Sequence, residues 1–245
     1  MAAPVRNRTK QLLNQNRYPE KKARNAPGRP VSDETVTAEH VVSLFDRSAV
    51  MLKPWRDTHT CWAVDITHPV GITERDGINL VRHDLRVPWL PPFDRDDIAF
   101  VAAFPPCDHL AISGARWFTG KGLRVLAESV TYFATSVEFV EWTESKWLIE
   151  NPVSTMSTYW RPPDHSFHPW QYAGLQPAEN YTKKTCLWTG GGFVMPPPAA
   201  LPPAGLFGGQ PPDDQHILAA NYTNGGDLRS QTPLGFALAV YEANL

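Results

Sequence analysis

Short apolar and β-branched runs alternate with helical patterns along most of the chain. Runs of this kind, bounded by turn residues, are typical of strands that alternate with helices. The predicted strands cover residues 40–45, 61–66, 78–83, 98–104 and 146–150. This alternation favours an α/β fold, with a mostly parallel sheet flanked by helices.

Between the last two predicted strands, apolar residues recur at spacings of three and four. They form one apolar face of a helix, which should pack on the sheet. The residues of this face are Leu123, Leu126, Val130, Phe133, Val137 and Val140. A second helix is predicted at the end of the chain, in the segment "TPLGFALAVYEANL".

Proline and glycine dominate the chain from residue 162 and are densest between 191 and 230, which predicts loop there. We therefore divide the chain into a basic arm (1–35), an α/β domain (36–190), a Pro/Gly-rich segment (191–230) and a closing helix that packs on the domain (231–245).

The composition predicts a globular protein with its own core, since 42% of 245 residues are hydrophobic and the net charge is −2. The N-terminus does not resemble a signal peptide, and no apolar run approaches the roughly 20 residues of a membrane span, so the expected location is the cytoplasm. Cys61, Cys107 and Cys186 are far apart, which fits neither a disulfide framework nor a CxxC zinc site. We expect reduced thiols and no metal.

The first 30 residues are strongly basic, with Glu20 as their one acid. The basic residues are Arg6, Arg8, Lys10, Arg17, Lys21, Lys22, Arg24 and Arg29. Two interpretations stay open: a solubilising disordered tail, or an arm that contacts the phosphates of a nucleic acid.

Polar residues follow several of the predicted strands, where ligands gather in open α/β sheets. Asp65 lies near the end of the second predicted strand and is placed to accept hydrogen bonds from ribose hydroxyls. Asp84 follows the third predicted strand, where it could receive an adenine amino group. The alternative for either aspartate is a helix cap or turn residue.

Cys107 follows two prolines, which stiffen the loop and can hold a nucleophile in attack geometry. Glu150 ends an apolar strand, where burial favours a protonated carboxyl group. The alternative for Glu150 is a cap for the segment that follows. A thiolate and an acid in one pocket suit attack on an electron-poor ring, such as cytosine in nucleic acid.

Pro105-Pro106-Cys107 and Glu150-Asn151-Pro152, in this order after two acidic strand ends, resemble the DNA cytosine carbon-5 methyltransferases, and most closely the compact members of bacteriophages. The resemblance covers about 41–190 and "RSQTPLGFALAV". It implies a class I methyltransferase (Rossmann-like) fold, S-adenosylmethionine as donor and a base flipped out of DNA. Cys107 would attack carbon 6 of the ring, Glu150 would protonate nitrogen 3, and Asn151 would help to hold the loop.

The resemblance also implies two binding sets. The cofactor set is Phe45, Asp46, Asp65, Ile66, Asp84, Leu85 and Pro105. The substrate and DNA set is Pro106, Lys183 and Lys184, although the lysines could equally be the solvated end of a strand. Trp117, just after the Cys107 loop, is a candidate for stacking on a base.

The first βα turn, "SLFDRSAV", departs from the family pattern, because Arg47 and Ala49 stand where glycines are expected. Three explanations stay open: the loop tolerates the changes, the pocket takes a modified one-carbon donor with which Arg47 could pair, or the donor has been lost. The last would leave a catalytically silent DNA-binding protein. Target recognition should be short or relaxed, since the region available for it is small.

Overall fold

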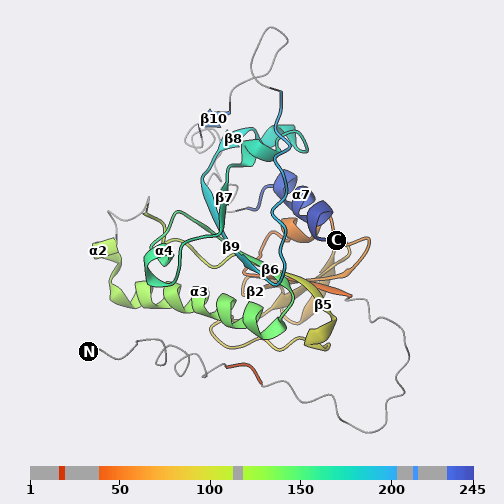
Figure 1. The fold of residues 1–245 in the computed structure, drawn as a ribbon. Coiled ribbons are helices and arrows are strands. Elements are labelled where there is room, and N and C mark those ends of the chain that lie inside the picture. The colour runs from red at the N-terminus through yellow and green to blue at the C-terminus, as the bar shows by residue number, and fades with distance from the viewer. Residues whose placement is uncertain (1–16, 20–38, 113–117, 203–211, 215–230) are drawn as a thin grey trace, which may run out of the picture.

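Eight strands form one mixed, mostly parallel sheet in the order β3-β4-β2-β1-β5-β6-β9-β7 (Figure 1). The structure is a computed structural model that describes residues 17–19, 39–112, 118–202, 212–214 and 231–245. The strands are β1 His40–Leu44, β2 Thr60–Asp65, β3 Ile72–Arg75, β4 Ile78–Arg82, β5 Ile98–Ala103, β6 Lys146–Pro152, β7 His165–Phe167 and β9 Thr185–Gly190. A second, small sheet pairs β8 Tyr181–Thr182 with β10 Asp213–Asp214. The predicted α/β class is confirmed.

The central strands β4, β2, β1, β5 and β6 are parallel neighbours. Their order is that of the first five strands in a doubly wound sheet. The full sheet departs from that pattern, because β3 extends one edge and β9 lies antiparallel between β6 and β7. Strand order reverses between β1 and β5, so the loops after these two strands begin side by side at one edge of the sheet.

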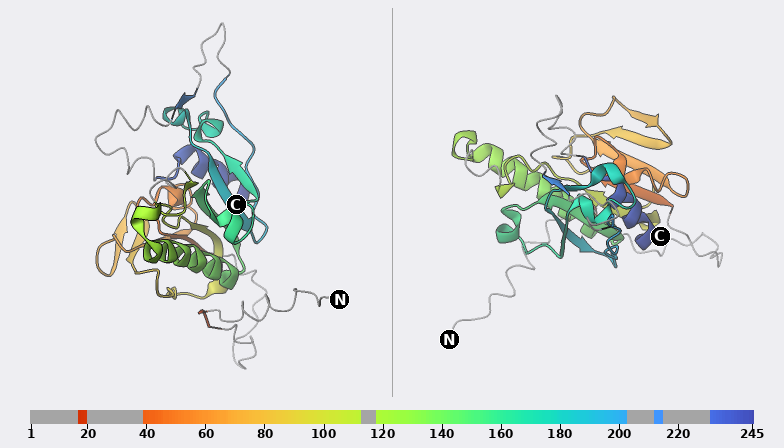
Figure 2. Two further views of the ribbon diagram at one scale, coloured as in Figure 1. Left: turned by 90° about the vertical axis from the view of Figure 1, so that its left-hand side faces the viewer. Right: turned by 90° about the horizontal axis from the view of Figure 1, so that it is seen from above.

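Helices cover both faces of the sheet (Figures 1 and 2). On one face α3, Leu123–Thr143, buries Phe133, Phe139 and Val140 in a core shared with the strands. On the other face, η1 (Val50–Leu52) and α7 (Leu234–Asn244) share a second core with the strands. The short helices are η2 Arg95–Asp97, α2 Phe118–Lys121, α4 Met156–Tyr159, η4 Pro169–Tyr172 and η5 Pro177–Glu179.

The five predicted strands are observed as β1, β2, β4, β5 and β6, each within two residues of its expected ends. Both predicted helices are observed as α3 and α7. The helical spacing gave the right face of α3 for most of its length, since Phe133 and Val140 lie in the core and Leu126, Val130 and Val137 pack against it. It was wrong for Leu123, the first residue of α3, which is 83% exposed.

Part of the basic arm is docked on α3. Arg17 forms an ion pair with Glu138 at 2.8 Å and donates a hydrogen bond to Thr135 at 2.6 Å. Tyr18 is buried and stacks on Trp142, with ring centroids 5.1 Å apart. Arg17 therefore contacts α3 in this structure and belongs to the folded domain.

Residues 1–16 and 20–35 of the arm, Trp117 and most of the segment 203–230 lie outside the described residues. Among the helices that the structure describes, none has both the length and the apolar character needed to cross a membrane.

Candidate active site

Cys107 and Glu150 lie at the same edge of the sheet. Their strands β5 and β6 are parallel neighbours, with Ala103 opposite Ile149. Glu150 follows Ile149 directly in β6, and Cys107 follows β5 in the Pro-Pro loop. The two side chains are close enough for the charge of Glu150 to raise the pKa of Cys107. The fold therefore brings together the thiol and the acid that the sequence singled out.

A hydrogen bond joins the Pro-Pro-Cys loop to the end of β6. Asn151, which is fully buried, donates from Nδ2 to the carbonyl oxygen of Pro105 at 2.9 Å. The chain after each motif pairs as well, because Ile112 N donates to Val153 O at 2.9 Å and Thr155 N donates to Leu110 O at 3.0 Å. The loop that bears Cys107 is thus fixed to β6 before the cysteine and to the segment that follows β6 after it.

Cys107 begins a tight turn. Its carbonyl oxygen accepts hydrogen bonds from Leu110 N and Ala111 N, each at 2.9 Å. The thiol is free and half-buried, whereas Cys61 and Cys186 are buried. As expected from the sequence, Cys186 is a core residue.

The surroundings favour neutral forms of both reactive groups. Burial, followed by the negative charges of Glu150 and Asp108, raises the pKa of Cys107 to about 11. Burial also raises the pKa of Glu150, and the positive charge of Lys183 lowers both values. Protonation of Glu150 removes its repulsion of a thiolate, so an acid at Glu150 and a thiolate at Cys107 are compatible states.

Lys183 reaches this pair because β9 runs antiparallel beside β6, with Leu187 opposite Glu150. Lys184 is exposed, and its charge acts on the pKa of His168 and of Cys186 instead. The structure therefore separates the two lysines that the sequence grouped together, and only Lys183 acts on the pKa values of both reactive groups.

Tyr181 belongs to the same neighbourhood and was not singled out in the sequence. Burial raises its pKa to about 12, and the nearby charges of Glu179 and Glu150 act in the same direction. Its hydroxyl group is therefore a neutral donor or acceptor close to Glu150. No spacing in "ENYTKKTC" marks this tyrosine, because its position depends on the pairing of β9 with β6.

The first loop, after β1, is shaped by Asp46. This buried carboxylate accepts hydrogen bonds from Ser48 Oγ at 2.9 Å and Ala49 N at 2.7 Å. Ala49 has a φ of 56°, in the left-handed region that glycine enters at least cost. Phe45 shares this conformation, with a φ of 56°. The loop thus keeps a backbone typical of glycine while carrying alanine.

The end of β2 forms a turn. Asp65 Oδ1 accepts hydrogen bonds from Thr67 N at 2.8 Å and Thr67 Oγ1 at 2.6 Å. Asp65 therefore acts as a turn residue, which is one of the two interpretations of this position from the sequence. Ile66, beside it, is 49% exposed and leaves an apolar surface next to a carboxylate.

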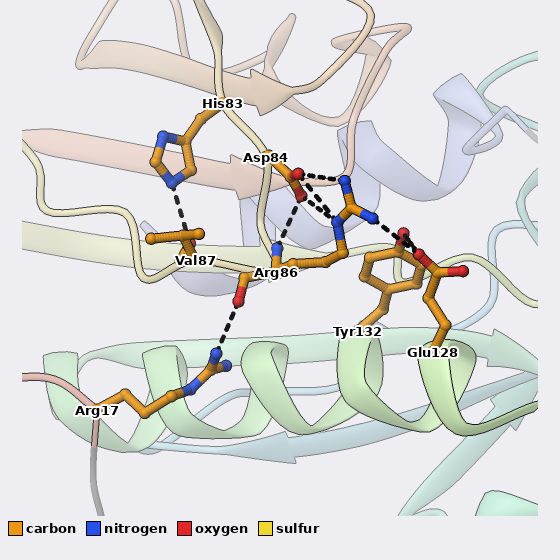
Figure 3. Close-up of polar contacts among 7 residues, drawn as sticks. All are labelled: Arg17, His83, Asp84, Arg86, Val87, Glu128 and Tyr132. Atoms are coloured by element: carbon orange, nitrogen blue, oxygen red, sulfur yellow. Dashed lines mark hydrogen bonds and ion pairs between the residues drawn. The ribbon is translucent and has the colours of Figure 1, made fainter. Parts of the chain in front are cut away.

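Asp84 is held by Arg86 (Figure 3). Arg86 Nε lies 2.9 Å from both carboxylate oxygens, and its Nη1 lies 3.2 Å from Glu128 on α3. These bonds hold the pKa of Asp84 below its usual range. Leu85 is buried in the core. Asp84 thus contributes to an ion-pair network with α3, and contacts of Asp84 and Leu85 with a cofactor stay predictions.

No protein-family model matches the chain, and no curated protein matches its sequence. Within the described ranges, no group of three or more His, Cys, Asp or Glu side chains is arranged to hold a metal ion. Function is therefore inferred from the chemistry of Cys107, Glu150 and their neighbours.

Proposed function

We propose that the protein transfers a methyl or related one-carbon group to carbon 5 of cytosine in DNA, through a covalent adduct with Cys107. The observation that carries this proposal is the hydrogen bond from Asn151 to the carbonyl oxygen of Pro105, at 2.9 Å. This bond joins the loop that carries Cys107, the proposed nucleophile, to the strand that carries Glu150, the proposed acid. A direct bond between the Pro-Pro-Cys loop and the Glu-Asn strand end supports the proposal that both residues act in one reaction centre.

The proposed reaction begins when the Cys107 thiolate forms a bond to carbon 6 of a flipped cytosine. Glu150 gives its proton to nitrogen 3, which neutralises the charge that develops on the ring. Carbon 5 would then attack the one-carbon group, and the rest of the donor would leave with the electron pair of the bond that breaks. Water would take the carbon-5 proton, and the electrons of that bond would restore the ring double bond and expel Cys107 as a thiolate. Nitrogen 3 would return its proton to Glu150, which completes the cycle. The raised pKa of Glu150 supports its role as acid.

A thiolate must form for this attack, although the pKa of Cys107 is about 11 in the protein alone. Two groups in the site favour its formation. Lys183 lowers the pKa by its positive charge, and protonation of Glu150 removes a repulsive charge. The thiolate is therefore expected to form mainly when the base has bound and Glu150 holds its proton.

S-adenosylmethionine, the donor that the resemblance implies, would supply an electrophilic methyl group when bound. The exposed Ile66 beside the Asp65 carboxylate fits a nucleoside, with an apolar surface for a base and an acceptor for ribose hydroxyls. Phe45, Asp46 and Pro105 lie at the ends of the adjacent β1 and β5. The left-handed Ala49 supports the explanation in which the first loop tolerates the loss of glycine.

We further propose a class I methyltransferase fold, supported by the doubly wound order of the five central strands. Pro106 and Lys183 would contact the flipped base, and Lys184 would contact a phosphate. Recognition of the target would rest on the short Pro/Gly-rich segment after β9.

Nucleoside analysis tests this proposal. The protein is incubated with cytosine-containing DNA and S-adenosylmethionine, the DNA is digested, and the nucleosides are analysed by mass spectrometry. A methylated cytosine that is absent with Cys107→Ser supports the proposal. Unmodified DNA, together with a Cys107-dependent adduct on 5-fluorocytosine DNA, indicates a different donor. Tight DNA binding with neither signal supports the silent relative and contradicts the enzyme.

A further inference from the structure

A cavity of about 430 Å³ lies away from Cys107 and Glu150. It opens to solvent and is bordered by the first loop, the loop after β2, strand β3 and part of β4. Its polar lining includes Arg47, His68, Thr73, Glu74 and Arg75. None of the lining residues comes from α3, from β5 or from the loop that bears Cys107.

Two polar atoms of this lining are buried without a partner. His68 is only 4% exposed, and its Nε2 has no hydrogen-bond partner among the residues that the structure describes. Within the same ranges, Thr73 Oγ1 is likewise unpartnered. A buried polar atom destabilises the fold when no hydrogen-bond partner satisfies it. Both residues line the cavity, so a polar ligand there would supply the missing partners once the two side chains turn toward it.

The charges around the cavity indicate the sign of that ligand. The lining contains two arginines, Arg47 and Arg75, and one acid, Glu74. Arg75 Nη2 donates hydrogen bonds to Arg47 O at 3.4 Å and Ser48 O at 3.2 Å, which ties β3 to the first loop. The positive charge of Arg75 also acts on His68. Guanidinium groups bind planar or tetrahedral oxyanions through several donors at once.

We propose that this cavity binds a small molecule through a terminal phosphate or carboxylate group, held by Arg47 and Arg75, with His68 Nε2 and Thr73 Oγ1 as buried hydrogen-bond partners. A volume of about 430 Å³ falls in the range of small-molecule sites. A terminal oxyanion needs less room at these side chains than a phosphodiester within a duplex, which carries a sugar on each side. This inference does not rest on the proposed methyl transfer.

Calorimetric titration of the full chain tests the proposal, with inorganic phosphate, acetate and adenosine 5′-monophosphate as probes. We expect saturable binding of at least one probe, and Arg47→Ala and Arg75→Ala should each weaken it about tenfold. Arg56→Ala is the matched control, since Arg56 is an exposed arginine outside the lining and should bind as the wild type does.

Glu74→Gln distinguishes a direct effect on binding from a loss of binding caused by misfolding. This exposed substitution removes the one acid of the lining, so it should tighten binding about threefold, a gain that misfolding cannot produce. His68→Phe should weaken binding. The proposal is overturned if the wild type binds none of the three probes, if Arg47→Ala and Arg75→Ala both bind as Arg56→Ala does, or if duplex DNA alone binds in a manner that depends on Arg75.

Discussion

Asn151 Nδ2 donates a hydrogen bond to the carbonyl oxygen of Pro105, at 2.9 Å, within a fully buried setting. The bond connects the end of β6 to the loop after β5. Neither Pro105 nor Pro106 has a backbone N–H. The carbonyl group of Pro105 is therefore one of the few backbone groups through which the sheet can form a hydrogen bond to the loop. The position of Cys107 relative to Glu150 therefore depends on Asn151.

Asn151→Ala should lower both the stability of the fold and the reactivity of Cys107, and a control variant should lower stability alone. Loss of a buried hydrogen bond should cost about 1–3 kcal/mol in urea unfolding, and the rate of adduct formation by Cys107 should fall at least about tenfold. Asn79→Ala is the matched control, because Asn79 Nδ2 donates to Cys61 O at 3.1 Å, away from the site. It should lower stability but leave the adduct rate unchanged. Equal slowing in both variants would contradict the positioning role.

The reactivity of Cys107 should depend on pH with a pKa near 11. Alkylation by iodoacetamide, followed at this residue by peptide mass spectrometry, should accelerate about tenfold per pH unit below that value. Glu150→Gln should speed alkylation at alkaline pH, where Glu150 is ionised and its replacement removes a repulsive charge, and Lys183→Met should slow it. Slower alkylation in Glu150→Gln, or faster alkylation in Lys183→Met, would refute the assigned electrostatics. Cys61, with a pKa of about 12 and a buried thiol, serves as internal control.

Glu150 should make the protein less stable as pH rises. Burial raises its folded-state pKa, so the native state binds the proton more tightly than the unfolded chain does. The resulting stabilisation is fully present below the ordinary pKa of glutamate, and is lost as pH rises through the folded-state value. The difference in unfolding free energy between wild type and Glu150→Gln, measured in urea, should therefore fall from acid to neutral pH. A difference that rises with pH would contradict the burial of this carboxyl group.

Two adjacent glycines after β9 should respond very differently to alanine. Gly191 has a φ of 61°, and a Cβ there would lie 1.7 Å from the carbonyl oxygen of Ser145. Gly192 has a φ of 84°, but a Cβ there meets no atom within 4 Å. Gly191→Ala should cost more than about 3 kcal/mol in thermal or urea unfolding, and Gly192→Ala about 1 kcal/mol. Similar losses in both variants would show that this turn is not packed against Ser145.

Much of the sheet could be predicted from sequence, because each central strand is an apolar run bounded by turn residues. The edge hairpin was missed although a signal was present. Asp76 and Gly77 connect β3 to β4 with φ values of 54° and 77°, and Asp-Gly is a frequent pair in two-residue hairpin turns. The four-residue β3 is mostly exposed, so it carries little hydrophobic pattern.

The candidate site was less predictable, because it depends on which strands become neighbours. Cys107, Glu150 and Asn151 were singled out from strand ends, and the parallel pairing of β5 with β6 brings them together. The approach of Lys183 requires β9 to run antiparallel beside β6, which no local pattern specifies. The ion pair between Asp84 and Arg86 depends on side-chain geometry that the spacing of residues in the sequence does not reveal.

Covalent trapping on 5-fluorocytosine DNA tests the central claim most directly, because fluorine at carbon 5 blocks release of the cysteine. The protein is incubated with this DNA and S-adenosylmethionine, and complexes that survive SDS are resolved on a gel and mapped by mass spectrometry. We predict a complex with the wild type whose linkage maps to Cys107, which is much weaker with Glu150→Gln and absent with Cys107→Ser. Absence of the complex from the wild type, or its survival in Cys107→Ser, would contradict the assignment of Cys107 as nucleophile.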